Sequence, residues 1–289
     1  MTTRTSTAVP HAEYFPLERK RTFHPALLLA PRREISEIVR FWPVIANMVI
    51  QELRVRYQRS FLGFFWTLLN PILMMTVLGF VFSNLYQGRT GDNFTLYLFA
   101  GMVPWGFVQS SIGESALCFI VNEGLIKKIY IPKIVFPLTR LLINLTTLGF
   151  TLTALFLMLI PLGARPSLAL FALPAALVLL AAFVLGLSLI VSTLNTFYRD
   201  CGHLVSVFLQ AWYFATPIIY KPEFLPQRIR WWLVFNPAYP VVKLFQDILA
   251  GGRWPDWPTW LMAAGIAATS VGVGYATFKS QEDKLVFRL

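Results

Sequence analysis

The sequence predicts an all-α integral membrane protein with six transmembrane helices. Hydrophobic residues make up 56% of the chain and charged residues only 13%, whereas an ordinary soluble domain is about 25% charged. A helix needs about 20 mostly apolar residues to cross the hydrocarbon core. Backbone polar groups in hydrocarbon must be satisfied within the segment, and continuous apolar runs lack the alternating pattern of barrel strands. Six runs without Asp, Glu, Lys or Arg are long enough: Ser60–Gly88, Asn93–Gly113, Leu141–Ala164, Pro166–Tyr198, Cys201–Tyr220 and Trp257–Phe278.

Three parts are predicted along the chain: a polar cytoplasmic tail over residues 1–33, an amphipathic interface helix over 34–59 and a six-span transmembrane domain over 60–289. The tail has no apolar periodicity and is expected to be poorly ordered. After Pro43, apolar and polar residues recur at helical spacing on opposite sides. We expect this helix to lie flat on the inner membrane surface, and packing against a soluble partner is the alternative. Its apolar side is Ile45, Val49, Leu53 and Tyr57, and its polar side is Asn47, Gln51, Arg54 and Gln58.

The distribution of basic residues predicts that both ends of the chain lie in the cytoplasm. Short loops rich in Lys and Arg stay on the cytoplasmic side, and an even number of spans puts both ends on one side. The net charge of +11 then attracts the anionic headgroups of membrane lipids, and we expect no nucleic-acid partner. The basic residues on the predicted inner side are Arg54, Arg56, Arg59, Lys127, Lys128, Lys133, Arg140, Arg199, Lys279, Lys284 and Arg288.

The predicted inner loop between the second and third spans, Asn122–Lys133, is long enough for two helical turns. Pro132 would end them, because proline cannot continue a helix. Leu125, Ile126 and Ile129 would give the loop an apolar face, where a solvated loop would have none. The sequence therefore predicts a compact, basic and partly apolar projection on the inner side.

The predicted outer loop, Lys221–Asp256, is neither polar nor flexible in composition. Trp231 and Trp232 suit the membrane interface, where an apolar ring and an N–H donor are both satisfied. Asn236 and Pro237 form a helix start, and the glycines at 251 and 252 form a stop. We expect one or two short half-inserted helices on the outer face. Their apolar stripe is Val241, Leu244, Phe245, Ile248 and Leu249.

Two features of the predicted spans concern how they pack. Glu114 and Arg140 are both expected at inner ends of neighbouring spans, so they are predicted to form an ion pair near the headgroups. Ala264, Ala268 and Gly272 recur at four-residue spacing in the last span, which predicts a ridge that permits close helix contact.

The sequence contains no signature of catalysis. There is no G-x-x-x-x-G-K-[ST] phosphate loop and no glycine followed by lysine, so we expect no nucleotide site of that kind and no enzymatic activity in this chain. The histidines, His11, His24 and His203, have no metal-ligand spacing, so we expect no metal site.

Six segments together resemble the membrane subunits of ABC transporters of the type-2 permease class, and within it the permeases that export O-antigen, teichoic acid or capsular polysaccharide. The combination is more specific than any one segment, and the resemblance runs from about Ile35 to the C-terminus. The segments are Arg54–Trp66, Leu69–Ile72, Leu125–Lys133, Phe197–Asp200, Ala215–Tyr220 and Phe235–Pro240.

The resemblance implies a homodimer that works with two copies of a separate ABC ATPase. ATP and Mg would be bound by that ATPase, with no cofactor in this chain. The substrate would be a lipid-linked polysaccharide, moved outwards from the inner leaflet of the bacterial inner (plasma) membrane. The class is multi-pass, which agrees with the six predicted spans.

The resemblance also assigns roles to residues. An ATPase-coupling surface would consist of Asn122, Glu123, Leu125, Ile126, Lys127, Lys128 and Ile129 together with Arg54, Arg56 and Arg59, and an outer gate of Trp231, Trp232, Asn236 and Pro237. Two other functions remain open, a type-2 permease for a small hydrophobic drug or lipid and a membrane scaffold without transport. An aromatic content of 15% and the Leu125–Lys133 loop favour polysaccharide export over the drug or lipid permease.

Overall fold

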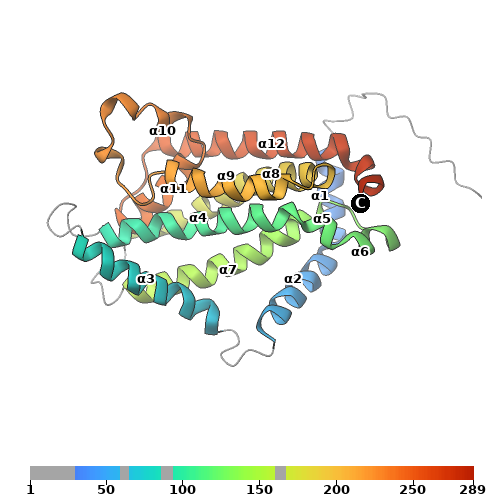
Figure 1. Cartoon of the computed structure of the whole chain (residues 1–289), viewed down its shortest axis with the longest axis horizontal. Helices are drawn as coiled ribbons and strands as arrows, with labels where there is room; N and C mark the ends of the chain where they lie inside the picture. Colours follow the sequence, from blue (N-terminus) through green and yellow to red (C-terminus); the bar gives the residue numbers. More distant parts are fainter. Residues whose placement is uncertain (1–29, 59–64, 86–93, 160–166) are drawn as a thin grey trace, which may run out of the picture.

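A computed structural model describes residues 30–58, 65–85, 94–159 and 167–289, and all regular secondary structure within these ranges is helical (Figure 1). The elements, in chain order, are α1 (Ala30–Arg40), α2 (Trp42–Tyr57), α3 (Trp66–Leu85), α4 (Phe94–Ala116), α5 (Cys118–Val121), α6 (Glu123–Lys128), α7 (Val135–Leu159), the 3-10 helix η3 (Leu168–Ala172), α8 (Leu173–Phe197), α9 (Cys201–Ala215), the 3-10 helices η4 (Pro222–Phe224) and η5 (Gln227–Ile229), α10 (Trp232–Phe235), α11 (Ala238–Phe245), the π-helix η6 (Gln246–Ala250) and α12 (Trp257–Arg288).

The all-α prediction is confirmed, and each of the six predicted apolar runs contains one of the helices α3, α4, α7, α8, α9 and α12. By length and hydropathy, three helical segments of the described residues are sufficient to cross a membrane: Val135–Met158, Leu168–Phe197 and Trp257–Arg288. The apolar part of α3 is shorter, Trp66–Val81. The number of six spans therefore stays a prediction.

Three helices extend beyond the predicted runs. α4 continues past Gly113 to Ala116 and includes Glu114, α7 begins at Val135 and includes Arg140, and α12 continues past Phe278 to Arg288. A run without charged residues marks the part of a helix that is compatible with the hydrocarbon core. The helix itself can continue beyond that run when its charged side chains form ion pairs. Arg140 pairs with Glu52, and Lys279 pairs with Glu282.

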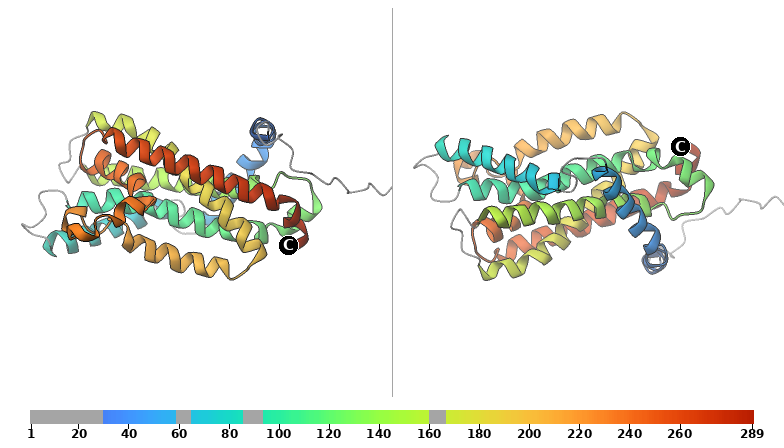
Figure 2. Two further views of the ribbon diagram at one scale, coloured as in Figure 1. Left: turned by 90° about the horizontal axis from the view of Figure 1, so that it is seen from above. Right: turned by 90° about the horizontal axis from the view of Figure 1, so that it is seen from below.

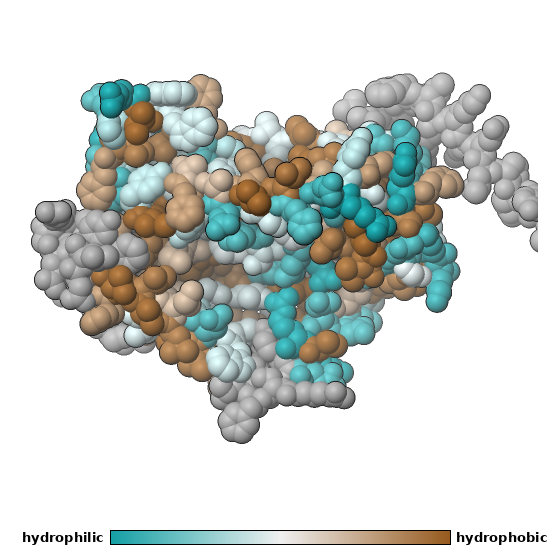
Figure 3. Space-filling model, viewed as in Figure 1, coloured by the Kyte–Doolittle hydropathy of each residue, from teal (hydrophilic) through white to brown (hydrophobic). Residues whose placement is uncertain are grey.

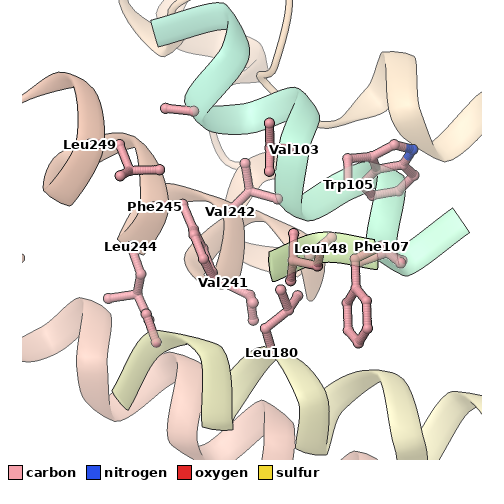
Figure 4. Close-up of a cluster of buried hydrophobic side chains, with 14 of the residues drawn as sticks. Val103, Trp105, Phe107, Leu148, Leu180, Val241, Val242, Leu244, Phe245 and Leu249 are labelled. Atoms are coloured by element: carbon pink, nitrogen blue, oxygen red, sulfur yellow. The ribbon is translucent and has the colours of Figure 1, made fainter. Parts of the chain in front are cut away.

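α4 lies at the centre of the bundle and packs against α3, α7, α8, α9 and α11. Figure 4 shows Val103 of α4 beside Val242 of α11, whereas Trp105 points away from α11 and its ring packs against Trp212 and Tyr213 of α9. The predicted apolar stripe of the outer loop runs over α11 and η6, and all its residues are buried: Val241, Leu244, Phe245, Ile248 and Leu249. The outer loop thus contributes to the main hydrophobic core instead of lying over it.

The closest helix contact in the bundle joins α8 to α12. A Cβ added to Gly186 would overlap the backbone of Ser270, and one added to Gly274 would overlap the backbone of Gly186. The Ser270 hydroxyl also donates to the carbonyl of Phe183 at 2.8 Å. Small residues permit this approach, and dispersion attraction between the two backbones holds it.

The predicted small-residue ridge on α12 is corrected by this packing. Ala268 and Gly272 are exposed, and the residues turned inward are Ala263, Ala267 and Gly274. Four-residue spacing occurs on more than one side of this helix, and the spacing alone does not say which side meets a neighbour.

A second hydrophobic cluster, called the inner cluster below, joins elements that are far apart in the sequence. Its fully buried members include Ile45 of α2, Phe119 of α5, Phe136 of α7, and Phe278 and Leu285 of α12. The ring of Phe119 lies 6.2 Å from that of Phe136 and 6.3 Å from that of Phe278, measured between centroids. Figure 1 shows the corresponding ends of α5 and α12 close to α1 and α6, away from the outer loop.

We predict that Gly274→Ala destabilises the fold, because the added methyl group would overlap the backbone of α8. Overpacking of this kind costs about 1–3 kcal/mol. Gly272→Ala on the same helix is the control, since its Cβ would meet nothing within 4 Å. Thermal unfolding of both purified variants in detergent measures the effect, and equal transition temperatures would contradict the role given to this contact.

Candidate functional site

The inner loop forms a small helical projection, as the sequence predicts. Asn122 donates through Nδ2 to the carbonyl of Cys118 at 2.7 Å, which closes α5. Lys127 donates to Glu123 at 2.6 Å across one turn of α6. α6 ends at Lys128 and the chain is extended at Ile129, shortly before Pro132. We call residues 118–132 the inner knob.

The apolar surface of the inner knob differs from the predicted one. Leu125 and Ile126 are half-buried and pack against the inner cluster of their own chain. Ile129 is 53% exposed and Tyr130 is 79% exposed, and Val121 is exposed beside α6. The surface open to a partner is therefore Val121, Ile129 and Tyr130, of which sequence reasoning identified only Ile129.

The C-terminal part of α12 holds the inner knob in place. Lys133 Nζ donates to the backbone carbonyl of Glu282 at 2.8 Å, and Lys279 pairs with the Glu282 carboxylate at 2.6 Å. Leu285 is buried in the inner cluster one turn further on. No sequence pattern indicated this contact, because Lys133 and Glu282 belong to segments far apart in the chain.

The predicted ion pair between Glu114 and Arg140 is corrected, since each residue has a different partner. Arg56 lies 3.5 Å from Glu114, and Arg140 lies 3.0 Å from Glu52. Asn144 also donates to Glu114 at 3.0 Å. The physical reason is that α2 packs against α7. This packing brings the Glu52 carboxylate to Arg140 and the Arg56 guanidinium to Glu114.

The basic residues expected before the first span have different environments. Arg54 is exposed, Arg56 is about one-third exposed and pairs with Glu114, and Arg59 lies outside the described residues. In α2, Ile45 is buried and Asn47 and Gln51 are exposed, but Ile50 and Val55 are exposed as well. The amphipathic interface helix therefore stays a prediction.

At the opposite end, Asn236 connects the start of α11 to the end of α9. Its Oδ1 accepts from the Trp212 indole at 2.8 Å and from the N–H of Ala238 at 3.1 Å. Its Nδ2 donates to the Thr216 hydroxyl at 3.0 Å and to the carbonyl of Ala215 at 3.2 Å. The predicted helix start is confirmed, and the buried Asn236 amide uses all its hydrogen-bonding directions.

An exposed aromatic patch precedes this junction. Trp231 and Trp232 are about half exposed and Phe235 is more so. The Trp231 ring packs edge-on against Trp232 at 6.2 Å and against Phe235 at 5.8 Å. Pro237 is exposed beside the patch, at the N-terminus of α11.

An ion pair between exposed Arg253 and buried Asp247 lies at the end of the π-helix η6. Arg253 donates through Nε at 3.0 Å and a terminal nitrogen at 2.7 Å to one oxygen of Asp247, whose side chain is almost fully buried. The hydrogen bond to Asp247 raises the pKa of Arg253. Burial, and then the negative charges of Asp247 and Glu223, raise the pKa of Tyr239.

The predicted glycine stop lies directly after this π-helix. Gly252 has a φ of 57°, a left-handed conformation that glycine adopts without steric cost. The turn allows the N–H of Arg253 to donate to the carbonyl of Asp247 at 3.1 Å. Sequence reasoning found the turn but missed the ion pair that it makes possible.

Metal-binding chemistry has no support among the described residues. Within these ranges there is no group of three or more His, Cys, Asp or Glu side chains that could hold a metal ion. Polar groups at both ends of the bundle connect helices to one another.

The chain is a helical bundle that includes helices long and apolar enough to cross a membrane. It belongs to the ABC-2 type transporter family, whose model matches residues 44–250. It is 31% identical over 232 residues to the O-antigen export system permease protein RfbA of Klebsiella pneumoniae, which covers 80% of this chain and 88% of that protein. The O-antigen export system permease protein RfbA of Myxococcus xanthus is 27% identical over 254 residues, and the match covers 87% of this chain and 97% of that protein. The polysialic acid transport protein KpsM of Escherichia coli is 23% identical over 247 residues, and the match covers 84% of this chain and 95% of that protein.

We predict that Asn236→Ala loosens α11 from α9, because it leaves the Trp212 indole N–H and the Ala238 N–H without their acceptor. A buried donor without a partner costs about 1–3 kcal/mol. Trypsin should then cleave after half-buried Lys243 faster than in the wild type. Asn47→Ala, at an exposed asparagine, is the control. Unchanged cleavage of Asn236→Ala would show that α11 is anchored by its apolar stripe alone.

Proposed function

We propose that this chain is the permease subunit of an ATP-driven ABC exporter that moves a lipid-linked polysaccharide, such as O-antigen, across the bacterial inner membrane. The observation that carries the proposal is the match, over most of their length, to permeases named for two different polysaccharides. Their shared cargo class favours a sugar polymer over a small hydrophobic drug or lipid. The chain itself would not be an enzyme, and ATP and Mg would be bound by the partner ATPase.

The topology proposed for this function has six spans and both termini in the cytoplasm. Its support is that the inner knob, α1 and the C-terminal end of α12 lie at one end of the bundle, opposite α10 (Figure 1). Lys127, Lys128, Lys279 and Lys284 belong to these inner elements, where basic residues favour the cytoplasmic side. The exposed tryptophans Trp231 and Trp232 belong to the opposite end, as expected for the outer membrane interface.

The inner knob is the proposed contact with the ATPase. Exposed ion pairs contribute under about 1 kcal/mol each, so Lys127 and Lys128 would orient the partner more than bind it. Burial of apolar surface contributes about 25 cal/mol per Å², and Val121, Ile129 and Tyr130 offer that surface. Motion of the inner knob would reach the spans through the inner cluster and through Lys133, which is bound to α12.

The outer loop is the proposed exit gate. Asn236 ties α11 to α9, and α11 packs against α4 and α12, so the loop would move only together with these helices. Trp231 and Trp232 form a patch at the exposed side of this unit. Pro237 at the start of α11 would limit the directions in which the unit can bend.

A homodimer is proposed because a single chain encloses little room for a polymer. α9 supports this proposal, since Leu209 is its only buried residue, whereas Leu204, Val207 and Phe208 are exposed. A second copy that packs against this face would cover it. Two ATPase subunits would then bind to the two inner knobs of one dimer.

Deleting the gene in the native bacterium tests the function. We expect loss of the surface polysaccharide and accumulation of the lipid-linked polymer inside the cell, both restored by a plasmid copy. Antibody staining of intact cells measures the first, and gel analysis of cell extracts measures the second. Unchanged surface polymer with increased sensitivity to hydrophobic drugs would favour the alternative substrate class.

We predict that Ile129→Asp combined with Tyr130→Asp uncouples the permease from its ATPase, because both side chains are exposed and apolar. Association measured by co-purification should fall by about tenfold or more, as expected for losing a buried apolar contact. Lys127→Gln with Lys128→Gln should reduce it by less than about fivefold. Leu125 is left unchanged because it packs inside its own chain. If the Asp pair leaves association intact, the exposed side of α2 becomes the better candidate.

We predict that Val207→Cys in a Cys201→Ser background forms a disulfide-linked dimer when membranes are oxidised. Val207 is exposed on α9, and the remaining cysteine, Cys118, is buried. Val273→Cys, at an exposed position of α12, is the matched control and should stay monomeric. Non-reducing gels measure both variants. Equal cross-linking of the two variants, or none in either, would count against a dimer formed through α9.

A further inference from the structure

The helix α12 continues beyond its apolar run, and we call residues 279–289 the α12 tip. The run Trp257–Phe278 is about 33 Å long at 1.5 Å per residue, which already matches a hydrocarbon core of about 30 Å. Phe287 follows about 13 Å after Phe278 along the helix, whereas the headgroup layer is only about 5–8 Å thick on each side. The α12 tip therefore reaches past the headgroups into the aqueous compartment.

One side of the α12 tip is fixed to the rest of the chain. Leu285 is fully buried in the inner cluster and Leu289 packs against that cluster. The carbonyl of Glu282 accepts a hydrogen bond from Lys133 Nζ at 2.8 Å. Both views of Figure 2 show the C-terminal end of α12 beside the inner knob. The α12 tip is thus held against the inner knob. The residues on this side recur at helical spacing: Phe278, Glu282, Leu285 and Leu289.

The opposite side of the α12 tip presents an aromatic ring to its surroundings. Phe287 is 85% exposed, the largest exposed fraction of any large hydrophobic side chain in the described ranges. Asp283 and Lys284 are also exposed, and at i−4 and i−3 they lie beside Phe287 on the helix surface. Figure 3 shows hydrophilic and hydrophobic residues side by side at this end of the molecule. An exposed aromatic side chain with a polar rim is typical of a contact site for another protein.

Lipid is excluded as the cover of Phe287 by distance and by charge. The ring would have to return across Asp283 and Lys284 to reach hydrocarbon, and burial of Leu285 holds the helix in place. The inner knob indicates which protein is the partner, because Ile129 and Tyr130 expose apolar surface at the same end of the bundle. A partner that binds the inner knob therefore meets the α12 tip beside it.

We infer that the α12 tip is a second contact for the ATPase subunit, with Phe287 as its apolar centre, an inference that rests on the proposed function. The ATPase would offer an apolar pocket for the ring, bordered by groups of both charges that face Asp283 and Lys284. Burial of the ring supplies most of the binding free energy, and exposed charge pairs supply little. Motion of the ATPase would then reach α12 directly as well as through the inner knob.

Substitutions at Phe287 test this inference in the complex of the permease with its co-expressed ATPase. Phe287→Asp should lower ATPase co-purification by about tenfold or more, because a buried aromatic side chain is lost. Phe287→Leu should retain most of it, since leucine keeps an apolar side chain. Lys284→Gln should lower it by less than about fivefold. Phe224→Asp is the control, because Phe224 is an exposed aromatic residue of η4, in the outer loop. Thermal unfolding and dimer yield of each variant are measured in parallel.

A direct probe identifies the partner. A photo-crosslinking benzoylphenylalanine at Phe287 should form an adduct with the ATPase in membranes, whereas the same residue at Phe224 should not. An adduct with a second copy of the chain or with lipid alone, or full co-purification by Phe287→Asp, would overturn the inference. The proposed function would survive that result if Ile129→Asp with Tyr130→Asp still abolished association. A wild-type chain that binds no ATPase at all would remove both.

Discussion

The contact between α8 and α12 at Gly186 and Gly274 is the constraint on which the other interactions depend. It brings the two backbones together so closely that neither glycine can carry a side chain. α12 is then fixed against the core, and both of its ends serve other elements. Its outer end packs against α11, where Lys243 donates to the Thr259 hydroxyl at 3.2 Å. Its inner end supplies Phe278 and Leu285 to the cluster beneath the inner knob.

Two kinds of interaction hold the inner end of the bundle, partly exposed ion pairs and a buried apolar cluster. The pairs that α2 makes with α4 and α7 involve partly exposed side chains, and solvent-exposed pairs of this type contribute little stability. The inner cluster, by contrast, is buried. Ile45 places α2 in the same buried cluster as Phe119 of the inner knob and Phe278 of α12, so apolar burial holds these three elements together more than the ion pairs do.

Much of the fold could be predicted because hydrocarbon imposes a simple rule on composition. Runs free of charge marked every long helix, and turn residues marked the start of α11 and the turn at Gly252. The wrong predictions, the small-residue ridge of α12 and the exposed Leu125, share one cause. Periodicity shows that Ala264, Ala268 and Gly272 share a side, and that Leu125 shares one with Ile129, but it does not show which neighbour covers that side.

The charged residues show the same limit. Glu114 and Arg140 were assigned to each other because their spans are consecutive, whereas α2 supplies the partner of each. The anchoring of Lys133 by Glu282 likewise depends on how far α12 extends beyond the apolar run. Such pairings are decided by the three-dimensional path of the chain, and a single sequence gives local spacing only.

α12 contains 32 residues in one unbroken helix, with a length of about 48 Å at 1.5 Å per residue. Gly274 divides it into an outer arm of about 26 Å and an inner arm of about 21 Å. α12 packs against α8 over an extended contact and not at this one point. A single helix of this length joins the inner cluster to α11, so the two ends of the bundle share one continuous structural element.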